Sequence, residues 1–114
     1  MGHLGIILYT DPFNSQNSTT VLKLIKSALK KGHSVSLFLM DNGIYNACPN
    51  LEFTKEKINI PDELSKLNIN LVTCGQNVKE RGFEEKDLIK NAKYGDMYDL
   101  SNIVKEVDRL ICFV

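Results

Sequence analysis

The chain has 114 residues, with 14 basic and 14 acidic side chains, so its formal net charge is zero. This length predicts one domain spanning residues 1–114, large enough to form a core without disulfide or metal support. Because no block of Lys or Arg stands out, the charge balance argues against nucleic acid or an anionic membrane surface as the main partner. No apolar run approaches the roughly 20 residues of a membrane span, and the N-terminus shows no charged-then-apolar leader.

The three cysteines are odd in number and irregularly spaced, and no two of them form a Cys-x-x-Cys pair. This pattern favours free thiols in a reducing compartment over a disulfide framework or a zinc site. The glycines that a flavin or dinucleotide fingerprint needs are also missing after the first predicted strand. We therefore expect a cytoplasmic protein with no cofactor and no metal.

The first half of the chain alternates strand and helix patterns. Its near-continuous apolar run at the start is typical of a strand covered on both faces, and the following helix has one apolar face. In order, the predicted elements are a strand at residues 3–9, a polar loop at 10–20, a helix at 19–31, a strand at 34–40, a turn at 41–43, a helical turn at 44–47 and a mobile loop at 48–60.

The second half repeats the alternation. The predicted elements are a short helix at residues 61–67, a strand at 69–73, helices at 76–81 and 84–92, a short strand at 94–98, a helix at 99–107 and a final apolar strand at 109–114. Strands alternating with helices predict a parallel sheet with right-handed crossovers. The fold class is therefore α/β: one three-layer domain, with a mostly parallel sheet of about five strands and helices on both faces.

Cys74 follows a β-branched strand pattern and precedes the helix that Gly82 ends. In an open α/β sheet, binding sites are built at this edge, and the unpaired amides of a helix N-terminus favour thiolate over thiol. We therefore expect a reactive, partly exposed thiol at Cys74. The alternative is a small apolar residue packed at the strand end, as free cysteines often are.

Two other cysteines invite different interpretations. Cys48 lies in the loop after the second strand and could approach Cys74 at the shared carboxyl edge, where it would resolve a persulfide as a disulfide. The alternative for Cys48 is an incidental loop thiol. Cys112 stands between Ile111 and Phe113 in an apolar strand, so we expect it to be buried in the core.

Polar residues on two loops lie at the same predicted edge. Hydroxyl and amide groups before a helix can hold an anion, although Pro12 removes one amide from this loop. The alternative is loop solvation with helix capping by Ser18 or Thr19. The candidate binding residues around a catalytic Cys74 are Thr10, Asp11, Asn14, Asp41, Asn42, Tyr45, Cys48 and Gly75.

Three stretches carry a resemblance to a known family. They are Cys74 with the later pair Arg81-Gly82, residues 31–38 with the loop 41–47, and the tail 108–113. In this order and spacing, nearly the whole chain resembles the DsrE/DsrF/TusD-like family of small sulfur-relay proteins. The resemblance implies that Cys74 accepts sulfur, and that the protein forms homo-oligomers or assembles with related subunits and meets a small sulfur-carrier partner.

The leading interpretation is a sulfur carrier or sulfurtransferase-type protein that holds a persulfide on Cys74. One alternative is an α/β module that binds a small anion or nucleotide, for which Cys74 would be dispensable. Another is a non-catalytic subunit of a sulfur-relay assembly. Apolar strands at both ends of the chain favour an oligomer whose core extends across a subunit contact.

Overall fold

The computed structural model describes residues 2–13, 16–49 and 58–114 of the chain. Five strands form one sheet in the order β4-β3-β2-β1-β5, and every neighbouring pair is parallel. The strands are β1 (His3–Leu8), β2 (Ser34–Leu39), β3 (Asn70–Cys74), β4 (Ala92–Gly95) and β5 (Arg109–Phe113). The predicted parallel sheet is confirmed.

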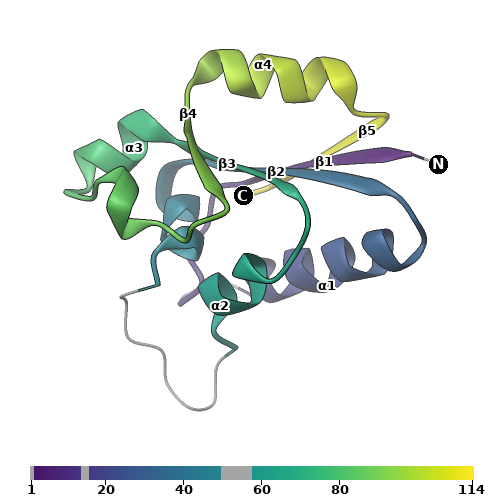
Figure 1. Cartoon of the computed structure of the whole chain (residues 1–114), viewed down its shortest axis with the longest axis horizontal. Helices are drawn as coiled ribbons and strands as arrows, with labels where there is room; N and C mark the ends of the chain where they lie inside the picture. The colour runs from purple at the N-terminus through teal and green to yellow at the C-terminus, as the bar shows by residue number, and fades with distance from the viewer. Residues whose placement is uncertain (1, 14–15, 50–57) are drawn as a thin grey trace.

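The helices cover the two faces of this sheet unequally. They are α1 (Asn17–Lys30), η1 (Asp41–Ala47), α2 (Ile60–Ser65), α3 (Gly75–Glu80), η2 (Glu85–Asp87) and α4 (Met97–Glu106), of which η1 and η2 are 3₁₀ helices. Residues of α1, α2, α3 and η1 join the larger buried cluster, whereas α4 packs on the opposite face (Figure 1). The three-layer architecture is therefore confirmed.

Alternation along the strands divides the core into two clusters. Ile6 pairs with Leu37 in register, and both belong to the larger cluster beneath the sheet. Their neighbours Ile7 and Phe38 point the other way and form the smaller cluster under α4. The apolar run at the start of the chain is thus covered on both faces, as its sequence predicts.

The predicted helix at residues 84–92 is wrong, because only the single turn η2 forms there. Leu88 has extended backbone angles, and the N–H of Ile89 donates to the carbonyl of Ala47 at 2.9 Å. Both side chains are buried, so tertiary pairing with η1 replaces the helical hydrogen bond. Ala92 then begins β4, two residues before the predicted strand.

The start of α1 also differs from the prediction. The helix begins at Asn17, so Ser18 lies inside it and its hydroxyl donates to the Asn46 side chain at 2.7 Å rather than capping a backbone amide. The mobile loop predicted at residues 48–60 falls largely on residues 50–57, which lie outside the described residues. Cys48 itself ends η1 and is buried.

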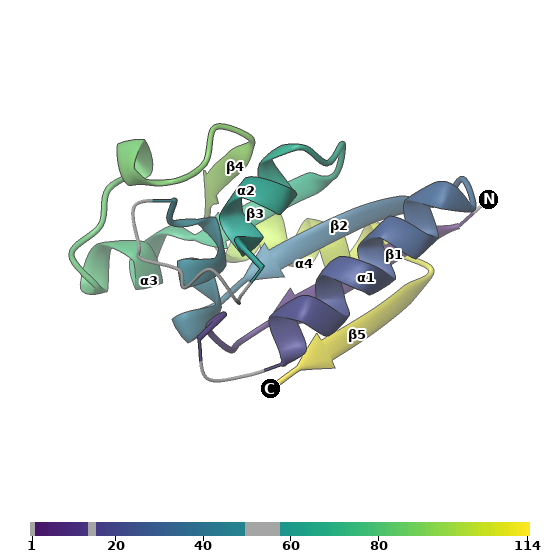
Figure 2. The same cartoon turned by 90° about the horizontal axis from the view of Figure 1, so that it is seen from below.

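The expected burial of Cys112 is wrong. β5 lies at the sheet edge beside β1, as Figure 2 shows, and every β5 residue except Phe113 is exposed. The apolar sequence of this strand predicted a core position, but neither face of an edge strand is covered unless a helix packs on it.

Within the described part of the chain, none of the helices is both long enough and apolar enough to cross a membrane.

Candidate functional site

Cys74 occupies the position that the sequence predicts. It is the last residue of β3 and the N-cap of α3, at the carboxyl edge of the sheet, paired in register with Gly95. Its side chain is 4% exposed and belongs to the smaller cluster with Ile7, Phe38, Val72 and Ile103. The expectation of a partly exposed thiol is therefore wrong, because alternation along β3 turns Cys74 inward beneath α4.

The turn from β3 into α3 depends on Gly75. A Cβ added there would lie 2.4 Å from the ring of Tyr94 and 3.0 Å from the carbonyl oxygen of Gly95. Tyr94 thus packs against the residue that follows Cys74, a neighbour that the sequence did not identify. It emerges only from the pairing of β3 with β4, which places Tyr94 opposite Thr73.

An ion pair and several hydrogen bonds join the start of η1 to α3. Arg81 forms an ion pair with Asp41, and its Nε donates to the Asn42 side chain at 3.2 Å. The N–H of Asp41 donates to Oδ1 of Asn77 at 2.8 Å, and Asp41 adopts a left-handed backbone with φ of 55°. The structure thus brings Asp41 and Asn42 to the edge that carries Cys74, and their side chains bond to Arg81.

The first loop is held by a residue that sequence reasoning missed. Buried Asn46 donates through Nδ2 to the carbonyls of Thr10 at 3.0 Å and Gly43 at 2.8 Å. Its Oδ1 accepts the Ser18 hydroxyl, so one amide side chain links this loop, η1 and α1. An Asn in a polar turn resembles a solvated loop residue, and only the fold shows that its environment is dry.

The remaining binding candidates also make contacts within the chain. Thr10 Oγ1 lies 3.3 Å from Nδ2 of Asn17, and Asp11 accepts the N–H of Phe13 at 2.8 Å. Tyr45 stacks edge-on against Phe83, with ring centroids 5.9 Å apart. Asn14 lies outside the described residues.

Cys48 is separated from Cys74 by the sheet. It belongs to the larger cluster on the α1 side, whereas Cys74 belongs to the cluster under α4. Its thiol donates to the carbonyl of Ile44 at 3.5 Å, and burial, with a smaller effect from Asp87, raises the pKa of Cys48 to about 11. At neutral pH this thiol is protonated, which disfavours attack on a persulfide.

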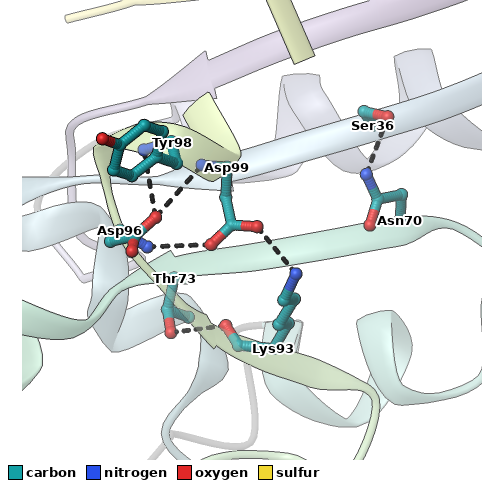
Figure 3. A network of polar contacts seen from close by, with 7 residues as sticks. All are labelled: Ser36, Asn70, Thr73, Lys93, Asp96, Tyr98 and Asp99. Carbon is teal, nitrogen blue, oxygen red and sulfur yellow. Dashed lines mark hydrogen bonds and ion pairs between the residues drawn. The ribbon is translucent and has the colours of Figure 1, made fainter. Parts of the chain in front are cut away.

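The turn between β4 and α4 follows Gly95, the register partner of Cys74, and is held by hydrogen bonds and an ion pair (Figure 3). Asp96 caps α4 by accepting the N–H groups of Tyr98 and Asp99 at 3.0 and 3.2 Å. Lys93 Nζ donates to Asp99 at 2.7 Å, and this hydrogen bond lowers the pKa of Asp99 and raises that of Lys93. α4 is thus anchored at its N-terminus.

No three His, Cys, Asp or Glu residues come together as a metal site within residues 2–13, 16–49 and 58–114. At the far end of the α4 face, buried Ser36 lies 2.7 Å from the ring of His3. Its hydroxyl oxygen also accepts from Nδ2 of Asn70 at 3.2 Å (Figure 3). These contacts satisfy a buried hydroxyl at the amino edge, away from Cys74.

Residues 3–113 match the DsrE/DsrF-like family. The chain belongs to this family. It is 33% identical to the uncharacterized protein MJ0989 of Methanocaldococcus jannaschii, over 95% of this chain and 96% of that protein. It is 26% identical to the uncharacterized protein MK0008 of Methanopyrus kandleri, over 96% and 93% of the two chains.

Two solved structures share the fold. The crystal structure of the YchN protein from E. coli superposes with a TM-score of 0.87 at 22% identity, covering 99% of this chain and all of that one. The protein of unknown function MTH1491 from Methanobacterium thermoautotrophicum superposes with a TM-score of 0.73 at 7% identity, covering 97% and 99%. The resemblance seen in the sequence is thereby confirmed at the level of family and fold.

Proposed function

We propose that this protein is a sulfur carrier that holds a persulfide on Cys74 and passes it to a partner thiol. The observation that carries the proposal is the placement of Cys74, at the end of a central parallel strand and directly before a helix, in a chain of the DsrE/DsrF-like family. Sites of open α/β sheets are built at this edge.

The transfer needs no oxidant, metal or second cysteine. The Cys74 thiolate attacks the outer sulfur of a donor persulfide, the new S–S bond forms, and the donor leaves as a thiolate. An acceptor thiolate then attacks the outer sulfur of the Cys74 persulfide, and Cys74 leaves as a thiolate. Each step exchanges one S–S bond for another, so that no electrons are gained or lost overall.

The burial of Cys74 adds a requirement to this mechanism. The side chains of Tyr9, Met40 and Leu100 are only partly buried where they pack against its cluster. Ile103 is the one residue of α4 within the buried part of that cluster. This thin cover supports access by a small displacement of side chains or of α4, so we expect the thiol to react slowly until a donor protein docks.

The wider setting follows from the same family. We propose a cytoplasmic protein that forms homo-oligomers or assembles with related subunits, and that receives or delivers sulfur through a small sulfur-carrier protein. The equal numbers of basic and acidic side chains suit such protein partners better than nucleic acid.

Intact mass measured after treatment with a persulfide or thiosulfonate donor tests the proposal. Because Cys112 is exposed and could itself react with a small donor, the measurement is made in a Cys112→Ser background. That protein should gain about 32 Da, reversible by reductant, and adding Cys74→Ser should abolish the gain because a serine hydroxyl is not a useful nucleophile without a base. Adding Cys48→Ser instead is the matched control, which should still load. Loading that persists in a folded Cys74→Ser, Cys112→Ser protein would refute the assignment.

The burial of Cys74 favours one alternative, a non-catalytic subunit whose cysteine is part of the core. The same experiment separates the two functions. A wild type that never gains sulfur, even with a small donor at long exposure, would indicate the non-catalytic subunit.

A further inference from the structure

A cavity of about 300 Å³ lies at the amino edge of the sheet, where α1 ends and where β1 and β5 begin. Figure 2 shows α1 running along β1 and ending near the start of that strand. Because the strands are parallel, this edge is opposite the one that carries Cys74, so a ligand bound here would be separate from the proposed sulfur site. The volume is at the lower end of the range for ligand pockets and suits a small molecule.

Part of the cavity lining is apolar because one face of α1 meets the first residues of β1. Leu24, Ala28 and Lys31 follow one another at i, i+4 and i+7, so they lie on one side of the end of this helix. Leu4 of β1 and Leu24 pack against the larger core cluster. Ala28 between them contributes only a methyl group, and this small side chain leaves the space open.

The lining also contains two cations. Arg109 pairs in register with Leu4, so its side chain leaves the sheet on the α1 side. Within the described part of the chain, neither Arg109 nor Lys31 has an ion-pair or hydrogen-bond partner for its charged group. The other arginine, Arg81, is by contrast paired with Asp41. The cavity thus presents positive charge that the chain itself does not neutralise.

His33 adds an uncharged donor to the same lining. The N–H of Gly2 donates to Nδ1 of His33 at 2.9 Å, so the ring hydrogen is on Nε2, and no group of the described residues accepts from that nitrogen. Asp108 is the acid of the lining, and its carboxylate accepts the N–H of His3 at 2.7 Å. Donors in search of an acceptor therefore outnumber acceptors at this cavity.

We infer that the cavity binds a small carboxylate with an apolar body, of the class of short-chain fatty acids. A carboxylate fits the planar fork of Arg109 through two parallel hydrogen bonds, and Lys31 adds a second positive charge. The apolar body covers Leu4, Leu24 and Ala28. An uncharged apolar ligand would leave the two cations without a partner, and inorganic phosphate would leave the apolar lining uncovered.

Titration of the 114-residue chain with hexanoate, followed by amide chemical shifts in NMR, tests the site. Hexanoate should shift the amides of Leu4, Ala28 and Arg109 with one saturable curve at millimolar concentration or below. 1-Hexanol keeps the apolar body without the charge and acetate keeps the charge without the body, so each should bind at least about tenfold more weakly. Shifts that do not saturate, or equal affinity for hexanoate and 1-hexanol, would overturn the inference.

Charge variants locate the carboxylate. Arg109→Met and Lys31→Met each keep an apolar stem and remove a charge, and Arg109→Met should weaken hexanoate binding by at least about tenfold. Lys30→Met is the matched control, because Lys30 is the neighbour of Lys31 on α1 and lies outside the cavity. If Lys30→Met weakens binding as much as Lys31→Met does, the effect is one of general charge and the inference is overturned.

A filling variant locates the apolar body. Ala28→Met extends a side chain into the cavity and leaves both cations in place, so it should abolish the hexanoate shifts in a protein whose spectrum is otherwise folded. Hexanoate binding that persists in folded Ala28→Met would place the ligand elsewhere and would also overturn the inference. Because Lys31 and Arg109 are exposed, their variants keep the inference testable if Ala28→Met does not fold.

Discussion

Cys48 and Cys74 are buried on opposite faces of the sheet, so their thiols lie in different surroundings. Both are buried, Cys74 as the last residue of β3 and Cys48 directly after η1, yet they join different clusters. Cys48 is enclosed by the larger cluster, and its pKa is raised to about 11. A two-cysteine redox cycle would require a path through the sheet, so a carrier with Cys74 acting alone is the simpler chemistry.

The raised pKa of Cys48 predicts a loss of stability in alkali. The unfolded chain releases this proton near 9.0, whereas the folded chain holds it to about 11, so the folded state binds more protons in between. Stability should therefore be unaffected by Cys48 below pH 9 and fall between pH 9 and 11, by at most about 1.4 kcal/mol per pH unit. Urea unfolding across this range measures the slope.

Cys48→Ser is the control for that slope, because serine does not ionise in this range. The substituted protein should show a shallower alkaline loss, even if it is less stable at neutral pH. Equal slopes in the two proteins would contradict the assignment of the effect to Cys48.

At the scale of elements, the site depends on close backbone contacts between loops and strands. A Cβ added at Gly43 in η1 would lie 2.0 Å from the carbonyl oxygen of Leu8 at the end of β1. The ion pair of Arg81 with Asp41 and its hydrogen bond to Asn42 then hold the same turn against α3. The position of η1 is thus set by a backbone contact that no larger residue permits.

Two glycine substitutions separate close contact from backbone strain. Gly43→Ala should destabilise the fold by about 3 kcal/mol or more, because the clashing atom belongs to the backbone and a strand cannot yield. Gly82→Ala should cost only about 1–2 kcal/mol, since Gly82 has a φ of +80° but no atom within 4 Å of the added methyl. Urea unfolding of both variants checks the order, and an equal or reversed order would refute this account.

At the scale of the molecule, carboxylates that pair with lysines on both faces of the sheet, Asp99 on α4 and Glu63 on α2, should contribute to stability in acid. The Lys93 hydrogen bond and the Asp96 backbone hold the pKa of Asp99 below its ordinary 3.8, and Lys26 lowers that of Glu63 below 4.5. The folded state therefore binds fewer protons than the unfolded state in acid. The stability that these carboxylates contribute is present above pH 4.5 and is lost as pH falls below about 4.

Asp99→Asn tests this loss of stability in acid, because an amide cannot titrate. Urea midpoints of the wild type should drop between pH 5 and pH 3, and the drop should be smaller in Asp99→Asn. Lys93→Met, which removes the partner of Asp99, should also reduce the loss of stability between pH 5 and pH 3. A full acid loss in both variants would show that other carboxylates dominate.

The sequence by itself determined the α/β class, most of the elements, the family and the strand-end position of Cys74. These follow from local signals: apolar runs, one-faced helices and the glycines that end them. The helix predicted at 84–92 was wrong because Leu88 and Ile89 bury their side chains against η1, a contact that local periodicity does not encode.

Only the tertiary structure decided which thiols are buried. Strand order placed β5 at the edge and exposed Cys112, although its neighbours are as apolar as those of a central strand. The alternation of β3 turned Cys74 under α4, and the packing of η1 placed Cys48 on the opposite face. Burial depends on what covers each face of the sheet, and this cover comes from segments distant in the chain, so no local pattern around a cysteine can predict it.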